Sequence, residues 1–530
     1  MRIKSSFYNS ITAVISSLIT MIIGLVTNKI FLQYLGTEYL GLNGLFTNII
    51  SMLSVAEMGI GSAIIFSLYK PIAENDVPKI KSLMNFYKKC YIRIAIVIAS
   101  IGILLIPMLK FIVKDYNIPI NMYIVYAMFL IESVVSYLLI YKRSIIYANQ
   151  KNYIINIVHI GYSILMNLFC LLALCTTKSY YLFLLIKIVF RILENLIVSK
   201  IAEKKYSYLR EKNVEKLDDG TYKEIIKKVK ALVIHQVVGF TVKGLDNIII
   251  STFFGLTAVG LCSNYTMLTS ACVTIGGQIL ASLTASIGNL LVENNKEKSY
   301  DIYKKIYFMD FCLATFLATG LMNVANDFIT VWIGKEYLYA NVIVFIFVLE
   351  FFYRQMRSAT AIFKEAAGIC YEDRFVPIIE AAVNAIASII FLKIAGIAGV
   401  FIGTILSQMV IHLYSYPKFV FKNLFSKELK EYYSMFVKYS LSAFIIGTIS
   451  YILCSLINIS NIYLNLIVHA MLTVLITMIS IYLVYRKQNE YIFFKGLIIK
   501  ALNKIIKKKV VAEWEKRLRY VLQDLHQYPH

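Results

Sequence analysis

Residues 36–51, Gly-Thr-Glu-Tyr-Leu-Gly-Leu-Asn-Gly-Leu-Phe-Thr-Asn-Ile-Ile-Ser, recur in altered form at residues 255–270, Gly-Leu-Thr-Ala-Val-Gly-Leu-Cys-Ser-Asn-Tyr-Thr-Met-Leu-Thr-Ser. At a constant offset of 219 residues, the glycines at 36 and 41 meet those at 255 and 260, and the Glu-Asn pair at 74–75 meets the pair at 293–294. Matches among leucines and isoleucines arise by chance in apolar sequences, but matched glycines and polar pairs carry information. The offset therefore predicts an internal repeat with one copy in each half of the chain.

The composition indicates that the chain buries its apolar surface in lipid. Of its 530 residues, 59% are hydrophobic and only 16% are charged, and the mean hydropathy is +0.68. A typical soluble domain is about a quarter charged. A single soluble core stops growing at roughly 250–300 residues, so an apolar excess spread over the whole chain does not fit one core. We therefore expect an all-α, polytopic membrane protein.

Fourteen apolar segments are long enough to cross a bilayer, which needs about 20 residues per helix. The predicted segments lie near 8–32, 40–66, 90–110, 120–140, 153–175, 179–199, 231–253, 257–291, 307–326, 338–360, 375–392, 396–416, 436–457 and 462–485.

The basic residues predict the orientation of these helices. If the N-terminus lies inside the cell, 43 of the 54 lysines and arginines fall on the inner side, six fall outside and five lie within helices. Such a bias is typical of cytoplasmic loops. The sequence therefore predicts that both termini are cytoplasmic. The net charge of +23 then reflects topology, and no nucleic-acid partner is expected.

The repeat and the helix count together predict the domain organisation. The expected parts are an N-terminal six-helix half (1–200), a cytoplasmic linker (201–230), a C-terminal six-helix half (231–417), helices 13 and 14 (436–485) and a basic amphipathic tail on the inner leaflet (486–530). Repeats that begin six helices apart have the same orientation, so the two halves are parallel repeats. Two such halves enclose a central cavity, and rocking one against the other gives alternating access.

Four stretches resemble a known transporter family. They are Gly24-Leu-Val-Thr-Asn-Lys-Ile-Phe-Leu-Gln-Tyr-Leu-Gly36, Ser54-Val-Ala-Glu-Met-Gly-Ile-Gly-Ser-Ala63, Ala148-Asn-Gln-Lys-Asn-Tyr153 and Asp246-Asn-Ile-Ile-Ile-Ser251 with the glycines at 255 and 260. In this order, they resemble the polysaccharide flippases of the multidrug, oligosaccharidyl-lipid and polysaccharide exporter (MOP) superfamily.

The resemblance implies a function. Such a flippase moves an undecaprenyl-diphosphate-linked oligosaccharide unit of capsule, O-unit or exopolysaccharide from the inner to the outer leaflet of the bacterial cytoplasmic membrane. It also implies contact with a polysaccharide polymerase and assembly proteins.

Two other transport functions stay open. Lipid II flippases of the superfamily carry an Arg-Asp pair late in their first helix, and the matching positions here are Thr27 and Asn28, which disfavours lipid II. Drug and cation exporters usually have twelve helices and acidic cavities, whereas the charges within helices here lean basic. An enzyme that polymerises or ligates polysaccharide needs a large outer loop, and the predicted outer loops are about ten residues long. We therefore expect a transporter rather than an enzyme.

Ionisable residues within the predicted helices are the candidate substrate-cavity residues, because a charge at bilayer depth normally faces a cavity or a partner. Lys187, Arg191 and Glu194 in the sixth segment share one helix face by their i, i+4, i+7 spacing. A guanidinium suits the oxygens of a diphosphate by its fork geometry. The alternative is a structural ion pair between arginine and glutamate.

The second half adds further candidates. Lys243 and Asp246 lie three residues apart in the seventh segment, and Glu350 and Arg354 form an i, i+4 pair in the tenth. These residues face the cavity or neutralise each other. Glu57 in the second segment has no nearby cation in sequence and is a candidate coupling residue; the alternative is a structural role.

No cofactor is expected. The cysteines and histidines show no metal-ligand spacing, and the glycines at 59 and 61 lack the Gly-Lys-Ser/Thr that a phosphate loop requires. Transport would then draw on an ion gradient, on the membrane potential or on consumption of the substrate outside.

Overall fold

In the computed structural model, each of the fourteen predicted segments overlaps one or two helices, and no strand occurs in the residues that the structure describes. These are residues 2–496 apart from 54–57, 114–117, 212–213, 216, 282, 294, 368 and 370–374. The helices of the first part are α1 (Arg2–Leu35), α2 (Thr37–Leu53), α3 (Met58–Glu74), α4 (Val77–Leu105), α5 (Leu109–Ile112), α6 (Met122–Tyr137), α7 (Arg143–Ala148), α8 (Asn152–Thr177) and α9 (Tyr180–Lys205). Those of the second part are α10 (Asp219–Ala281), α11 (Thr284–Val292), α12 (Lys296–Trp332), α13 (Asn341–Met356), α14 (Ser358–Ala366), α15 (Val376–Ala395), α16 (Ile397–Val410), α17 (Tyr416–Val420), α18 (Leu429–Ser455) and α19 (Ile462–Tyr485).

Ten spans within the described residues are long and apolar enough to cross a membrane. The other four predicted segments fall on α2 with α3, on α9, on the first part of α10 and on α13. Two of these four helices are less suited to cross a membrane on their own. Helix α9 contains three charged residues in its apolar stretch, and α13 is only 16 residues long. The protein is a multi-pass membrane protein.

Polar side chains cap the N-termini of several helices. Asp76, Asn121, Ser179, Asn295 and Asn461 each accept a hydrogen bond from a backbone N–H in the first turn of the following helix. Such caps satisfy N–H groups that have no partner within the helix. They place the starts of α4, α6, α9, α12 and α19.

The connection between α9 and α10 is shorter than the predicted linker. Helix α9 continues to Lys205, and α10 begins at Asp219, inside the range expected for the linker. Asp218 caps α10 by accepting a hydrogen bond from the backbone N–H of Thr221, at 2.8 Å. This bond lowers the pKa of the Asp218 carboxyl.

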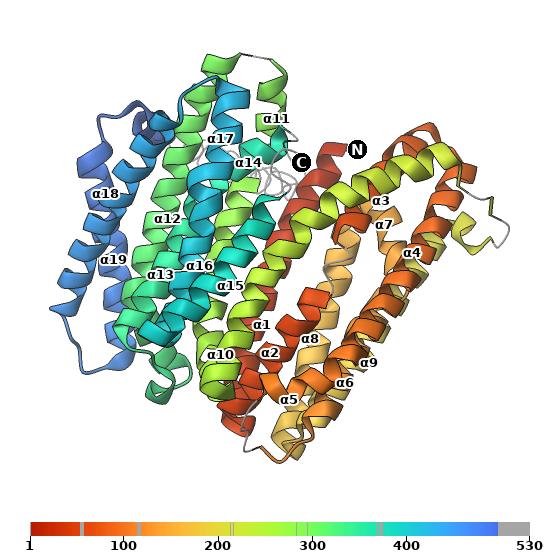
Figure 1. Ribbon diagram of the computed structural model, residues 1–530, viewed down its shortest axis with the longest axis horizontal. Helices are drawn as coiled ribbons and strands as arrows, with labels where there is room; N and C mark the ends of the chain where they lie inside the picture. The colour runs from red at the N-terminus through yellow and green to blue at the C-terminus, as the bar shows by residue number, and fades with distance from the viewer. Residues whose placement is uncertain are drawn as a thin grey trace, which may run out of the picture.

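Two buried hydrophobic clusters form the core. One contains residues between 31 and 225 together with Leu256, and the other contains residues between 249 and 485. Figure 1 shows α1–α9 on one side and α11–α19 on the other, with α10 running from the first group to the second. The domain boundaries expected from the sequence stay a prediction.

The repeated glycines occupy equivalent positions. Gly36 and Gly255 both have positive φ, at +90° and +79°, and Gly255 divides α10 into two helices. Gly41 and Gly260 lie where α2 crosses the second part of α10, so close that a Cβ on Gly41 would lie 1.9 Å from the carbonyl oxygen of Leu256. A Cβ on Gly260 would lie 2.4 Å from the carbonyl oxygen of Thr37. The repeat thus supplies matching breaks and matching contact points to the two halves.

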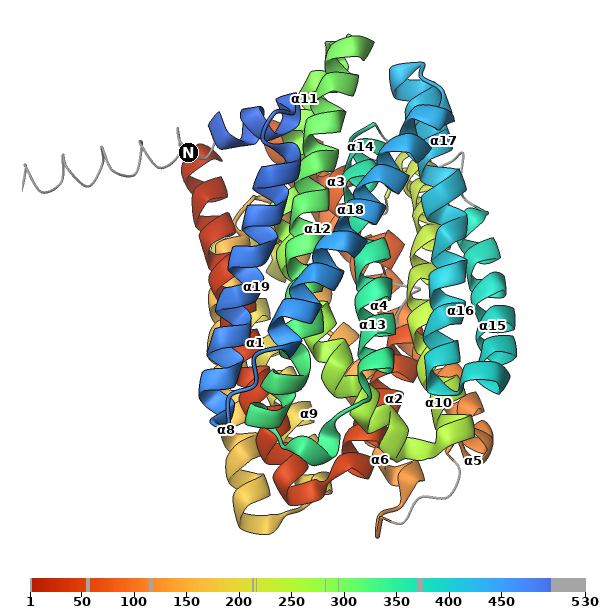
Figure 2. The same ribbon diagram turned by 90° about the vertical axis from the view of Figure 1, so that its left-hand side faces the viewer.

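Helix α1 is tied to the second half by side-chain contacts. The indole N–H of Trp332 donates to the carbonyl oxygen of Leu25 at 2.9 Å, and the amide of Asn28 donates to Asn264 at 3.1 Å. Figure 2 shows α18 and α19 on the outer face of the bundle, beside α12. These two helices are the ones that the repeat does not include.

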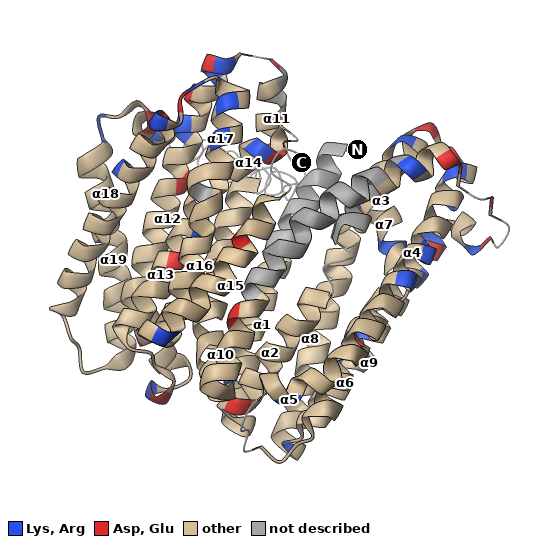
Figure 3. Ribbon diagram, viewed as in Figure 1, with Lys and Arg blue, Asp and Glu red and all other residues tan. Residues whose placement is uncertain are grey.

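Charged residues gather at one end of the bundle (Figure 3). This end holds the segments that the sequence places inside the cell, among them the starts of α4 and α12 and the end of α9.

We expect Asp219→Cys in a cysteine-free background to resist an impermeant thiol reagent in intact cells, because Asp219 starts α10 at the charged end. Lys335→Cys, exposed in the opposite connection between α12 and α13, should react. Labelling of Asp219→Cys in intact cells would contradict the predicted topology.

Candidate functional site

A buried carboxylate organises a polar cluster in the first half. The side chain of Glu194 on α9 is fully buried, and three basic side chains from three helices contact it. Nη2 of Arg143 and Nδ1 of His159 lie 3.2 and 3.1 Å from its Oε1, and Nη1 of Arg191 lies 2.9 Å from its Oε2. The cluster thus joins α7, α8 and α9.

Arg191 is partly exposed, more than Arg143 but less than His159. Its side chain is 29% exposed, and it also lies 3.8 Å from Glu132 on α6 and 5.3 Å above the ring of Tyr162. Its Nε is buried and makes no hydrogen bond within the described structure. The guanidinium therefore has an ion-pair partner and keeps one unused donor.

Lys187 differs from Arg191 in its surroundings. Its Nζ lies 5.3 and 6.0 Å from the ring centroids of Phe183 and Phe129, and no carboxylate of the described residues lies within 4 Å of it. Cation–π contacts stabilise a cation without neutralising it. Arg143 and Arg191 balance Glu132 and Glu194, so Lys187 adds an excess of one positive charge to this region before His159 is counted.

A second polar site lies in a cavity of about 350 Å³ between the halves. The lining residues come from α2 (Asn48, Ser51), α10 (Asp246, Asn247, Thr266, Thr269, Ser270), α13 (Phe347, Glu350, Arg354), the residue after α13 (Arg357), α15 (Glu380) and α16 (Phe401, Thr404, Gln408). Both halves therefore contribute to the cavity.

Neighbouring side chains hold the carboxylates of the cavity in place. Asp246 accepts hydrogen bonds from the Thr404 hydroxyl at 2.8 Å and from the Asn384 amide at 3.4 Å. Glu350 accepts from Gln408 at 2.7 Å and lies 3.4 Å from Arg354. The Asp246 side chain is thus bound by neutral groups of α15 and α16, whereas Glu350 is bound partly by a cation.

The cavity also contains unused polar atoms. Arg357 lies 3.8 Å from Glu380. Nε of Arg354 and Oε1 of Gln408 are buried without a hydrogen-bond partner. Because buried polar atoms are normally satisfied, such atoms point to water or a polar ligand in the cavity.

The structure places the candidate residues in two separate sites. Asp246, Glu350 and Arg354 share the cavity, and the i, i+4 pair expected for the last two is present. Lys187, Arg191 and Glu194 belong to the cluster of the first half, where the ion pair that the sequence analysis kept as its alternative is formed. The roles of all these residues stay predictions.

Two other candidates cannot be placed. Glu57 lies outside the described residues, and so does the side chain of Lys243, although its backbone belongs to α10. Neither has a place in the geometry of the two sites.

Sequence reasoning missed several members of both sites. Glu132 and Glu380 lie inside apolar helices, where their charge alone marks them as candidates. Arg143 lies outside the fourteen predicted segments, and His159 lies within the fifth without metal-ligand spacing, so neither was a candidate. Their approach to Glu194 depends on how α7 and α8 pack against α9, which no local pattern indicates.

The positions that distinguish lipid II flippases form neutral contacts. The Thr27 hydroxyl donates to Asn167 at 2.9 Å, and Asn28 contacts Asn264 across the halves. In the described part of the chain, no three His, Cys, Asp or Glu side chains come together as a metal site would require.

Comparison with known proteins identifies the fold. No protein-family model matches the sequence, and no curated protein matches it significantly. Among solved structures, the lipid II flippase MurJ in an inward closed conformation is similar with a TM-score of 0.61 at 17% identity, covering 89% of this chain and 98% of MurJ. An inward-facing multidrug resistance MATE transporter gives a TM-score of 0.60 at 13% identity, covering 77% and 96%. The Vibrio cholerae MATE transporter VcmN gives 0.58 at 14% identity, covering 80% and 98%. The chain has the fold of the MOP-superfamily transporters.

Proposed function

We propose that the protein is a flippase for an undecaprenyl-diphosphate-linked oligosaccharide unit, and that it works by alternating access of its two halves. The observation that carries this proposal is the likeness to a lipid flippase over 89% of the chain. The MATE transporters match only 77–80% of this chain. The further part of the chain that MurJ matches is about as long as α18 and α19 together. The long apolar carrier of such a substrate distinguishes it from the small drugs that a twelve-helix exporter moves.

The charge distribution supports a diphosphate substrate. Arg191 is partly exposed, and together with Lys187 and Arg143 it exceeds Glu132 and Glu194 by one positive charge. Fixed cations in a partly desolvated site bind phosphate oxygens well, and arginine presents them with a planar fork. A carrier for cationic drugs would gain nothing from this excess.

Lipid II is the second candidate, and the likeness to the lipid II flippase MurJ favours it. Thr27 and Asn28 count against it, because they stand where the lipid II flippases carry an arginine and an aspartate. Both side chains are neutral, and both are hydrogen-bonded to neutral asparagines, Asn167 and Asn264. We therefore place the substrate among the capsule, O-unit or exopolysaccharide precursors.

The proposal includes a location and partners. The protein would lie in the bacterial cytoplasmic membrane with both termini inside, and a polysaccharide polymerase and assembly proteins would receive its product. An ion gradient or the membrane potential would supply the energy for transport.

Depletion of the protein tests the substrate. We expect an undecaprenyl-diphosphate-linked oligosaccharide to accumulate on the inner side of the membrane, measured by mass spectrometry of extracted lipids. A control strain with restored expression should return to the normal level. Accumulation of lipid II instead would support the second candidate, and an unchanged lipid profile with raised sensitivity to cationic drugs would contradict both.

A further inference from the structure

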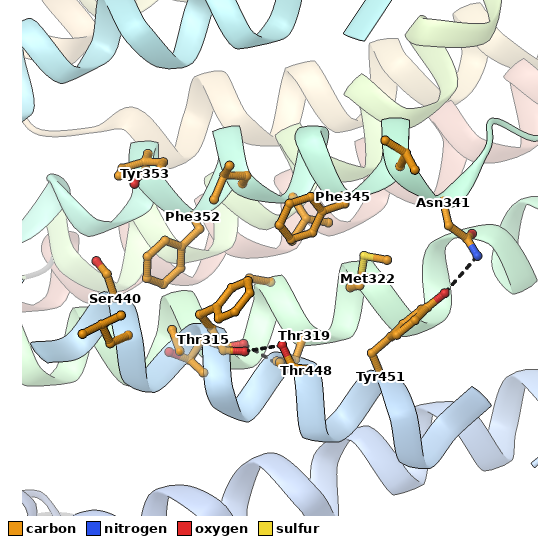
Figure 4. A pocket seen from close by; sticks show the side chains of 18 residues that line it. Thr315, Thr319, Met322, Asn341, Phe345, Phe352, Tyr353, Ser440, Thr448 and Tyr451 are labelled. Atoms are coloured by element: carbon orange, nitrogen blue, oxygen red, sulfur yellow. Dashed lines mark hydrogen bonds between the residues drawn. The ribbon is translucent and has the colours of Figure 1, made fainter. Parts of the chain in front are cut away.

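A membrane-facing pocket of about 600 Å³ lies outside both polar sites, between α12, α13 and α18. Figure 4 shows its two ends: Ser440 and Tyr353 lie at one, and Asn341 and Tyr451 lie at the other. The Asn341 amide donates to the Tyr451 hydroxyl at 3.1 Å and joins α13 to α18 at that end. A pocket of this volume is large enough for a drug-sized ligand or part of a lipid.

The side chains that line the pocket are mainly apolar, and several of them are exposed on the outside of the protein. Val342, Leu441 and Phe444 are 69%, 57% and 59% exposed. On a membrane-spanning helix, such side chains face lipid chains rather than water. The pocket is therefore accessible to a lipid from the side.

Two hydroxyl groups in the pocket have no partner. Thr315 is fully buried on α12, and its Oγ1 makes no hydrogen bond within the described structure. The hydroxyl of Ser440 on α18 is also buried and unpartnered. An alkyl chain alone would leave both unsatisfied, so the occupant that fits carries oxygen acceptors at this depth.

The pocket continues into a basic hollow along the same face of α18. Lys430, Ser434, Val437 and Lys438 line this hollow with Tyr433. Positions 434, 437, 441, 444, 448 and 451 follow each other at helical spacing, so the hollow and the pocket lie in line along one face of α18. Together they are called the groove. Both lysines are exposed, and no described carboxylate lies within 4 Å of either.

We propose that this groove binds one anionic glycerophospholipid, with its phosphate at Lys430 and Lys438, its ester carbonyls at Ser440 and Thr315 and one acyl chain along α18 toward the Asn341–Tyr451 contact. Cations, hydroxyl donors and apolar walls follow each other along α18 in the order in which a phospholipid carries phosphate, esters and chains. Basic pockets between membrane helices are known to bind anionic headgroups. A polyprenyl diphosphate has no ester carbonyl, so it would leave both hydroxyls unpaired. The lipid would fill the gap between α13 and α18 as a resident component, whatever substrate is transported.

Binding to the purified, delipidated full-length protein tests the assignment. We expect phosphatidylglycerol to bind and to raise the melting temperature more than phosphatidylcholine or undecaprenyl phosphate does. In the variant Lys430→Gln with Lys438→Gln, phosphatidylglycerol should bind about fivefold more weakly per lost lysine and should no longer differ from phosphatidylcholine. Lys422→Gln, which removes an exposed lysine outside the groove, should leave binding unchanged.

Two further variants probe the interior of the groove. A Cβ on Gly447 meets only Thr319 Cγ2, at 3.6 Å, so Gly447→Ala should bind as the wild type does and Gly447→Leu should block the acyl chain. Thr315→Val should weaken binding without lowering the melting temperature of the lipid-free protein, because the hydroxyl has no partner there to lose. If Gly447→Leu does not fold, the binding of phosphatidylglycerol by Thr315→Val tests the interior of the groove by itself.

Three outcomes would overturn the proposal. They are equal binding of phosphatidylglycerol and phosphatidylcholine by the wild type, unchanged binding by Thr315→Val, and tighter binding of undecaprenyl phosphate than of phosphatidylglycerol. The last result would assign the groove to the carrier of a transported substrate instead.

Discussion

Arg191→Ala is expected to abolish export of the lipid-linked substrate while the protein stays in the membrane at its normal amount. Glu194 would keep Arg143 and His159 as partners, so the loss of one guanidinium does not leave the buried carboxylate alone. The partly exposed guanidinium of Arg191 would no longer be available to a diphosphate. Export should be followed as protection of the labelled oligosaccharide in proteoliposomes, and protein amount by immunoblotting of membranes.

Arg191→Lys separates charge from geometry. It keeps the positive charge but loses the planar fork, so we expect only part of the export rate to return. Arg93→Ala is the matched control, because Arg93 is an exposed arginine of α4 outside the cluster. A wild-type rate for Arg191→Ala would remove the cluster from the substrate pathway and leave the cavity with Asp246 and Glu350.

Glu194→Gln should behave differently from Arg191→Ala. Removing the carboxylate charge leaves Arg143 without the carboxylate it pairs with, and leaves Arg191 with only the more distant Glu132, at 3.8 Å. Breaking a buried ion pair in this way costs about 3–5 kcal/mol. We therefore expect a clear loss of protein from the membrane, and a normal amount of Glu194→Gln would show that the ion pairs do not hold α7, α8 and α9 together.

The sequence predicted the fold well because its main signals are local and repeated. Apolar length marks each membrane helix, and lysines and arginines outside the segments mark their ends. The glycine matches at 36 with 255 and 41 with 260 were visible because a positive φ and a close backbone contact both exclude other residues. Helix ends were less accurate where a cap, such as Asp218, begins a helix before the apolar segment does.

The two polar sites could be predicted only in part. Charges inside apolar segments identified Arg191, Glu194 and Glu350, since their cost in lipid demands a partner. The partners themselves are far away in sequence: Arg143 approaches Glu194 across 51 positions and Thr404 approaches Asp246 across 158. Neutral partners such as Thr404 and Gln408 give no signal at all in a sequence, because a hydroxyl or amide is tolerated in any helix interface.

Gly41→Ala is expected to reduce the stability of the protein strongly although alanine is the better helix former. Replacing glycine by alanine inside a helix normally gains about 0.5–1 kcal/mol. Here the new Cβ would lie 1.9 Å from the carbonyl oxygen of Leu256 and 2.7 Å from its carbon. Both neighbours are backbone atoms of α10 and cannot turn away as a side chain can, so α2 and α10 must separate along their whole crossing. The two halves meet at this crossing, and the separation should therefore also open the cavity lined by Asn48 and Ser51.

Gly277→Ala supplies the control for this effect. Gly277 lies in the part of α10 that contains Gly260, and nothing lies within 4 Å of the added Cβ. Its melting temperature in detergent should equal or exceed that of the wild type. Gly41→Ala and its repeat counterpart Gly260→Ala should both melt at lower temperature and give less monodisperse protein in size-exclusion chromatography. Since each glycine approaches the other's helix, the double variant should be less destabilised than the sum of the two single variants. If Gly41→Ala melted at or above the wild-type temperature, the close crossing of α2 and α10 would be wrong.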